Sequence, residues 1–114
     1  MANNERTIEK ISKLAEKGKT SKVIPFLYED EAEVVIYAIG ALAPGAITDE
    51  ESRNAVSHML DDSRPTVRSA AAKALSTIGM EYSKTRLQYR YGVEQDPKVK
   101  ADIMEAIQTI NKKR

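Results

Sequence analysis

The strongest constraint in this 114-residue chain is a pattern of apolar side chains that returns about every 32 or 33 residues. Counted from Val67, small or apolar residues recur at offsets of 4, 7, 8 and 11, which lie on one stripe of an α-helix. The same offsets from Val99, Val34 and, more loosely, Thr7 mark three further helices, and we call all four A helices. The four stripes are Thr7, Ile11, Leu14, Ala15 and Gly18; Val34, Ala38, Ala41, Leu42 and Gly45; Val67, Ala71, Ala74, Leu75 and Ile78; and Val99, Ile103, Ala106, Ile107 and Ile110. The recurring alanines allow neighbouring helices to approach closely.

Residues typical of helix ends stand at the expected places. Asp96 followed by Pro97 is typical of an N-cap and the first helical turn, where the N–H that proline lacks has no helical partner. Gly18 and Gly79 stand where an A helix would end in the left-handed conformation.

Shorter apolar segments, which we call B helices, lie between the A helices. Two triplets of apolar residues align at a separation of 33: Val23, Phe26 and Leu27 with Val56, Met59 and Leu60. Pro25 predicts that the first B helix is short or kinked, and Thr48 with Glu51 fits a capping box at the start of the second.

The third B segment, residues 80–95, is ambiguous. Apolar and aromatic side chains alternate at Leu87, Tyr89, Tyr91 and Val93 as in a strand, but the place of the segment in the repeat favours a helix. In a helix, the buried face contains either Leu87 and Tyr91 or Tyr89 and Val93.

Stacked A and B helices form a helical solenoid. The unit over residues 61–79 resembles a HEAT repeat, of the short HEAT-like kind also found in phycobilin lyases. The residues that carry this resemblance are Asp61-Asp62, Pro65, Val67-Arg68, Ala71, Ala74-Leu75 and Ile78-Gly79, followed one unit later by Pro97, Val99-Lys100, Ala106-Ile107 and Ile110. We therefore expect one all-α domain over residues 1–114, a right-handed α-solenoid of HEAT-like helical hairpins with about three and a half repeats and seven helices. Its A/B units cover about residues 4–28, 31–60 and 65–93, and a terminal A helix covers 97–111.

The resemblance also implies contacts between repeats. Arg68 and Lys100 occupy equivalent positions and are expected to pair with turn carboxylates such as Asp62 and Asp96, which would set the stacking angle. Val35 takes the place of the basic residue in the preceding unit, so a continuous ladder of such pairs is not expected.

The sequence offers little for catalysis, and we predict no catalytic residue, metal or cofactor. His58, the one histidine, is followed within one helical turn by Asp61 and Asp62, a pattern more typical of an exposed helix end than of a metal site. Cysteine is absent, and no glycine-rich phosphate loop occurs. Neither an apolar run long enough to span a membrane nor a secretory signal is apparent, so a cytoplasmic location is expected.

The third B segment is the best candidate for a binding surface. It combines tyrosines with cations, the side chains most enriched at binding hot spots: Tyr82, Lys84, Arg86, Tyr89, Arg90 and Tyr91. In HEAT-like solenoids the B helices line the concave face where partners dock, so the resemblance implies a non-catalytic adaptor or scaffold that binds a protein. The alternatives are a bilin-lyase-like or other modifying factor, and a nucleic-acid-binding protein, which the acidic stretch 29–63 disfavours.

The terminal A helix offers a second contact. It has an apolar stripe, widened by Met104, and no B helix after it, so self-association through this end is a further prediction, with the basic tail 112–114 beside the contact.

Overall fold

The computed structural model describes residues 3–113, which form seven α-helices and two short 3₁₀ helices with no strand among them. The A helices are α1 (Asn3–Glu16), α3 (Ala32–Ala46), α5 (Pro65–Ile78) and α7 (Pro97–Lys112). The B helices are α2 (Thr20–Val23) continued by η1 (Ile24–Tyr28), α4 (Glu50–His58) continued by η2 (Met59–Asp61), and α6 (Glu81–Val93).

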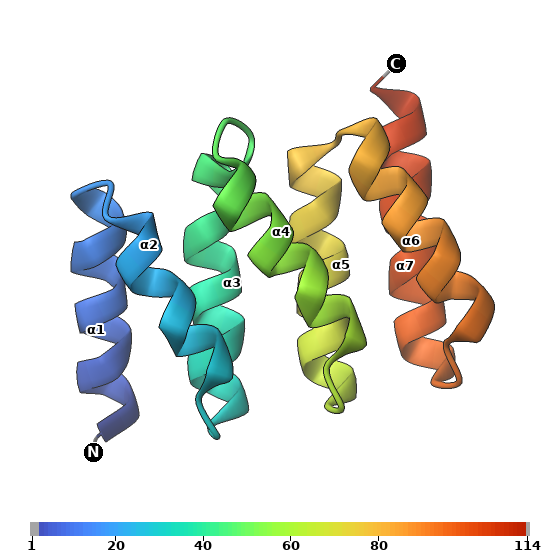
Figure 1. Cartoon of the computed structure of the whole chain (residues 1–114). Coiled ribbons are helices and arrows are strands. Elements are labelled where there is room, and N and C mark those ends of the chain that lie inside the picture. The colour runs from blue at the N-terminus through green and yellow to red at the C-terminus, as the bar shows by residue number, and fades with distance from the viewer. Residues whose placement is uncertain (1–2, 114) are drawn as a thin grey trace.

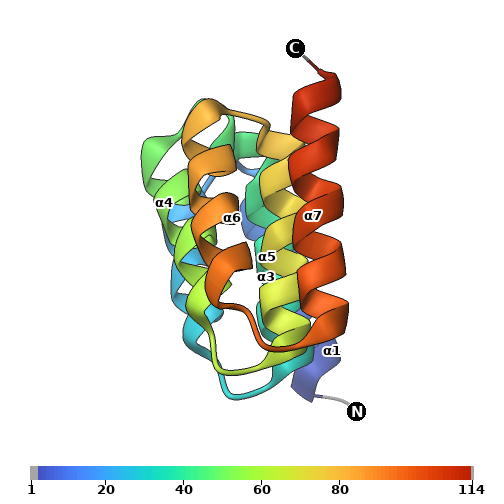
Figure 2. The ribbon, with the colours of Figure 1, turned by 90° about the vertical axis from the view of Figure 1, so that its right-hand side faces the viewer.

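These helices form two layers. Figure 1 looks onto the B helices with the A helices behind them, and Figure 2, turned by 90°, shows the two layers side by side. Each A helix contacts the next A helix in the chain. Of the B helices, α4 contacts both α3 and α5, and α6 contacts both α5 and α7. The molecule measures 37 × 29 × 18 Å along its principal axes. The predicted all-α solenoid with seven helical segments is confirmed.

The repeated stripes form the core between the layers. All five stripe residues of α5 and all five of α7 are buried. Within α5, Ala71 and Ala72 have no exposed surface, and this helix lies between α3 and α7 in direct contact with both. Small side chains in the middle helix therefore coincide with close packing on both of its sides, as the alanine-rich pattern predicts.

The predicted ends of the A helices are also confirmed. Gly18 and Gly79 adopt left-handed backbone angles, with φ of 73° and 67°. Asp96 caps α7, since its Oδ1 accepts hydrogen bonds from the backbone N–H groups of Lys98 (2.9 Å) and Val99 (3.2 Å).

The first two B helices differ from expectation in one detail. The α-helix α2 ends at Val23 and continues as a 3₁₀ helix through Pro25, which confirms a short, interrupted first B helix. The capping box at Thr48 is wrong: the N-cap of α4 is Asp49, and the Thr48 hydroxyl donates to the Gly45 carbonyl instead (3.4 Å). The Asp49 carboxylate accepts from the hydroxyls of Ser52 (2.6 Å) and Thr20 (3.1 Å), so it joins α4 to the preceding B helix.

The ambiguous third segment is helical, as its place in the repeat predicted. Leu87 is fully buried and Tyr91 packs against the core, whereas Tyr89 and Val93 are 65% and 43% exposed. Of the two possible buried faces, the one that contains Leu87 and Tyr91 is therefore the real one.

The apolar stripe of α7 is covered by the chain itself, and Met104 beside it is half-buried. Self-association through this helix stays a prediction, and Arg114 of the basic tail lies outside the described residues. Within residues 3–113, no helix is both long enough and apolar enough to cross a bilayer.

Candidate functional site

The six residues singled out on the third B helix separate into two groups in the structure. Tyr82 and Tyr89 are 47% and 65% exposed, and Lys84 is half-buried. Tyr82 and Tyr89 lie seven residues apart, about two turns of helix, so both point from the same side of α6. Tyr82 and Tyr89 are thus the widely exposed aromatic side chains of the set.

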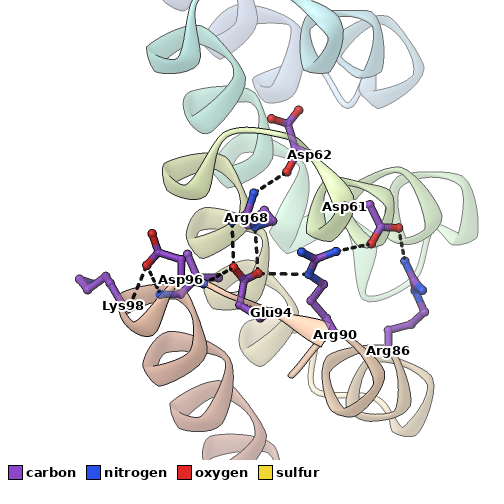
Figure 3. A network of polar contacts seen from close by, with 9 residues as sticks. Asp61, Asp62, Arg68, Arg86, Arg90, Glu94, Asp96 and Lys98 are labelled. Atoms are coloured by element: carbon purple, nitrogen blue, oxygen red, sulfur yellow. Dashed lines mark hydrogen bonds and ion pairs between the residues drawn. The ribbon is translucent and has the colours of Figure 1, made fainter. Parts of the chain in front are cut away.

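The two arginines of α6 are bound to the neighbouring B helix. Arg86 donates to the Ser57 carbonyl (3.2 Å) and to Oδ2 of Asp61 (3.4 Å), while Arg90 donates to Oδ1 of the same aspartate (3.3 Å). Figure 3 shows both guanidinium groups directed at Asp61. They therefore fix α6 against the end of α4 and η2, and their charge is largely compensated within the chain.

Tyr91 and Lys100 form a contact that the sequence did not predict. The Lys100 Nζ lies 4.6 Å from the centroid of the Tyr91 ring, a cation–π arrangement between α6 and α7. The expected pairing of Lys100 with Asp96 is wrong, because the side chain of Asp96 is occupied as the N-cap of α7. Tyr91 is thus part of the packing between these helices.

The strongest polar contact joins Arg68 of α5 to Glu94, which follows α6. Arg68 donates through Nε to Oε1 (2.9 Å) and through Nη2 to Oε2 (2.8 Å), a bidentate geometry. Its remaining Nη1 donates to the backbone carbonyl of Asp62 (2.9 Å). Arg68 therefore spans the turns of two successive repeats (Figure 3).

Glu94 is the centre of this network. Its side chain is fully buried and also accepts from Arg90 Nε (3.1 Å) and from the backbone N–H of Asp96 (3.0 Å). Burial by itself raises the pKa of Glu94, but the hydrogen bonds from Arg68, Asp96 and Arg90 outweigh it and lower the pKa from 4.5 to about 2. The carboxylate is thus held ionised as the link between α5, α6 and α7.

The prediction that Arg68 pairs with the carboxylate of Asp62 is therefore wrong. The carboxylate of Asp62 is held instead by Arg64, at 2.9 and 3.1 Å, and the hydrogen bond from Arg64 lowers the pKa of Asp62. Glu94 stands 32 residues after Asp62 and is its repeat equivalent, three residues before the proline of its own unit. The same offset of 32 residues relates Arg68 to Lys100, so the repeat itself contains the signal that identifies Glu94.

Each repeat turn is thereby joined to its neighbour in a different way. Arg64 donates through Nη1 to the carbonyls of Glu29 (3.3 Å) and Asp30 (3.0 Å) in the preceding turn. Val35, at the position equivalent to Arg68, is fully buried and contributes no charge. The series of arginine–carboxylate pairs is therefore interrupted at Val35, as expected. At that place Arg64 connects the two successive turns.

The histidine and its neighbouring carboxylates do not form a metal site. His58 is exposed, while Asp61 and Asp62 are held by arginines. Across residues 3–113, no three His, Cys, Asp or Glu side chains gather closely enough to hold a metal ion.

Comparison with known proteins agrees with the repeat architecture. A family model described as HEAT repeats matches residues 20–108. No curated protein and no solved structure matches the chain.

Proposed function

The chain belongs to the HEAT repeat family, and from this premise we propose that it is a small, non-catalytic cytoplasmic adaptor that binds a protein partner on its B-helix face. HEAT repeats generally mediate protein–protein interactions. The step from this family property to α6 as the binding surface is our own.

The observation that carries the proposal is the exposure of Tyr82 and Tyr89 on a helix that Arg86 and Arg90 join to the preceding repeat. Tyrosine supplies a large apolar ring and one polar group at a small entropic cost, which explains its enrichment at binding hot spots. Arg86 and Arg90 join α6 to the preceding repeat, and Leu87 anchors it in the core, so the two rings project from a helix that is already packed before binding.

The same geometry favours a protein over a nucleic acid as the partner. Two of the three cations near the tyrosines are paired with carboxylates of this chain: Arg86 with Asp61, and Arg90 with Asp61 and Glu94. A phosphate backbone would have to compete with these carboxylates, whereas an uncharged protein surface would not. Lys84 is the remaining cation of the set.

The test is affinity capture of partners from a lysate of the source organism, with nuclease present, followed by mass spectrometry. Wild type is compared with Tyr82→Ala/Tyr89→Ala, two changes that leave the ion pairs of α6 intact. Tyr28→Ala is the matched control, since Tyr28 lies on η1 and is 65% exposed, as Tyr89 is.

We expect a protein that is retained by wild type and by Tyr28→Ala but lost from the double variant. Purified partner should then bind the double variant at least about tenfold more weakly, because two hot-spot side chains are removed. Equal binding by all three proteins would contradict the assignment of α6. Retention that disappears on nuclease treatment would instead identify a nucleic-acid-mediated contact.

A further inference from the structure

The exposed side of α1 carries a stripe of cations that the proposed adaptor function does not use. At offsets of 0, 4, 7 and 11, four exposed side chains follow one side of the helix over about 16 Å: Arg6, Lys10, Lys13 and Lys17. Lys17 continues the helical pattern, because its N–H donates to the Lys13 carbonyl at 3.2 Å. In Figure 1, α1 forms the end of the molecule opposite α6 and α7, so this stripe is distinct from the tyrosines of α6.

The charge of this stripe is not compensated within the described residues 3–113. There, the side chains of Arg6, Lys10 and Lys17 form no ion pair or hydrogen bond. Lys13 lies 4.0 Å from Glu9, and because both side chains are widely exposed, this pair contributes little to stability. In the later repeats, by contrast, arginines donate to carboxylates of the chain itself: Arg64, Arg68, Arg86 and Arg90. The four cations of α1 are therefore available to a negatively charged partner.

The cations surround a small apolar spot. A hollow of about 330 Å³ on the surface of α1 is lined by the four cations together with Glu9 and Leu14. Leu14 is half-buried and packs against the core, so the rest of its side chain is apolar surface among charged groups. A ligand that fits this lining combines several negative charges with an apolar group.

A second stripe restricts the class of partner. Glu5, Glu9 and Glu16 follow one another at offsets of 0, 4 and 11, about a quarter of a turn around the helix from the cations. A flat anionic bilayer or a nucleic acid duplex would meet both stripes, whose charges largely cancel. In addition, α1 has no aromatic side chain on which a nucleic-acid base could stack. A peptide segment is narrow enough to contact the cations without the glutamates, so the charge pattern favours an acidic protein segment.

We propose that α1 binds an acidic segment of a second partner protein, with carboxylates opposite the four cations and an apolar side chain over Leu14. The segment is attracted by the stripe rather than by the chain as a whole, since the net charge of the chain is only +1. Together with the surface proposed on α6, a site at the other end of the molecule would let the adaptor join two proteins.

The test measures binding of defined probes to the purified full chain at low salt. The main probe is a labelled peptide of four Glu-Glu-Leu units, followed by fluorescence anisotropy. Three further probes are the same peptide with serine in place of leucine, single-stranded DNA of equal net charge, and vesicles that contain phosphatidylserine. Wild type is compared with Lys10→Gln/Lys13→Gln, in which both changes are exposed and retain helix-forming residues. The matched control is Lys84→Gln/Lys112→Gln, which removes the same charge from α6 and α7 at the other end of the molecule.

We expect the leucine peptide to bind wild type and the control alike, and to bind Lys10→Gln/Lys13→Gln at least about tenfold more weakly. The serine peptide, the DNA and the vesicles should bind wild type more weakly than the leucine peptide does. The Tyr82→Ala/Tyr89→Ala protein should bind the leucine peptide as wild type does, so this result and that of the α6 assignment are obtained independently.

Four outcomes would overturn the inference. The first is that wild type does not bind the leucine peptide. The second is that both lysine variants lose affinity equally, because the attraction would then be a general response to positive charge. The third is loss of binding in Tyr82→Ala/Tyr89→Ala, which would place the acidic ligand on α6. The fourth is that the DNA or the vesicles bind more tightly than the leucine peptide, which would identify a different class of partner.

Discussion

Arg68 and Glu94 form a bidentate ion pair at 2.9 and 2.8 Å across two successive repeats, with 11% of the arginine side chain and none of the glutamate side chain exposed. A buried pair of this kind gains little over apolar packing, but it is costly to break because the remaining charge loses its partner. The pair also lies where α5, α6 and α7 meet, so it constrains the angle between the last two repeats.

The first prediction concerns this pair. We expect Glu94→Gln to lower the free energy of unfolding by about 3 kcal/mol, since it removes the carboxylate that Arg68 binds through two hydrogen bonds. Arg68→Gln should cost somewhat less, about 2 kcal/mol, because Glu94 keeps its contact with Arg90. The double variant should lose clearly less than the sum, with a coupling energy of about 1–2 kcal/mol. Urea unfolding followed by circular dichroism measures all three values. Lys13→Gln, which removes an exposed pair at 4.0 Å, is the control and should change stability by less than about 0.5 kcal/mol. Additive losses for Arg68 and Glu94 would contradict the pairing.

The second prediction is a pH dependence. The pKa of Glu94 in the folded chain is about 2, below its ordinary value of 4.5, so the folded state favours the ionised form. Its contribution to stability is therefore fully present above about pH 5 and is lost as the pH falls towards 2. The difference in unfolding free energy between wild type and Glu94→Gln should be largest near pH 6 and should shrink steadily down to pH 2.5. A difference that stays constant over this range would show that the charge of Glu94 does not matter.

The third prediction compares two glycines in different backbone conformations. Gly40 lies within α3 with open space where a Cβ would stand, so Gly40→Ala should raise the free energy of unfolding by about 1 kcal/mol. Gly79 ends α5 at φ of 67°, so Gly79→Ala should lower it by about 1–2 kcal/mol. Thermal unfolding of the two variants should shift in opposite directions. A shift of the same sign would contradict the left-handed end of α5.

The fourth prediction tests the N-cap of α7. Asp96→Ala should cost about 1 kcal/mol, because the backbone N–H groups of Lys98 and Val99 lose their acceptor. Asp96→Asn keeps an oxygen at the same position and should be nearly neutral in chemical denaturation. If both variants were equally destabilised, the charge of Asp96 rather than its capping hydrogen bonds would be the important property.

The sequence predicted which residues of α6 form the candidate site, but not which of them are exposed and which are bound within the chain. The cluster of tyrosines and cations on residues 82–91 was predicted as one surface, and only the structure separates Tyr82 and Tyr89, which are exposed, from Arg86, Arg90 and Tyr91, which bind the chain itself. The helical spacing of these residues is a local property, whereas the partner of a long side chain depends on how neighbouring helices are placed.

The sequence by itself determined the helices, their order and the residues of the core. A stripe such as Val67, Ala71 and Leu75 is a local pattern with a helical period, and its return after 32 or 33 residues leaves few ways to bury it other than a stack of similar units. The helix ends at Gly18 and Gly79 and the helix start at Asp96-Pro97 could be predicted for the same reason, because the conformation that these residues favour depends on only a few neighbouring residues.

Only the tertiary structure decided which charges meet. Arg68 reaches Glu94 rather than the carboxylate of Asp62, and Lys100 lies over Tyr91 rather than beside Asp96. These choices depend on the crossing of α5, α6 and α7 and on turns that bring residues 26 positions apart to within 3 Å.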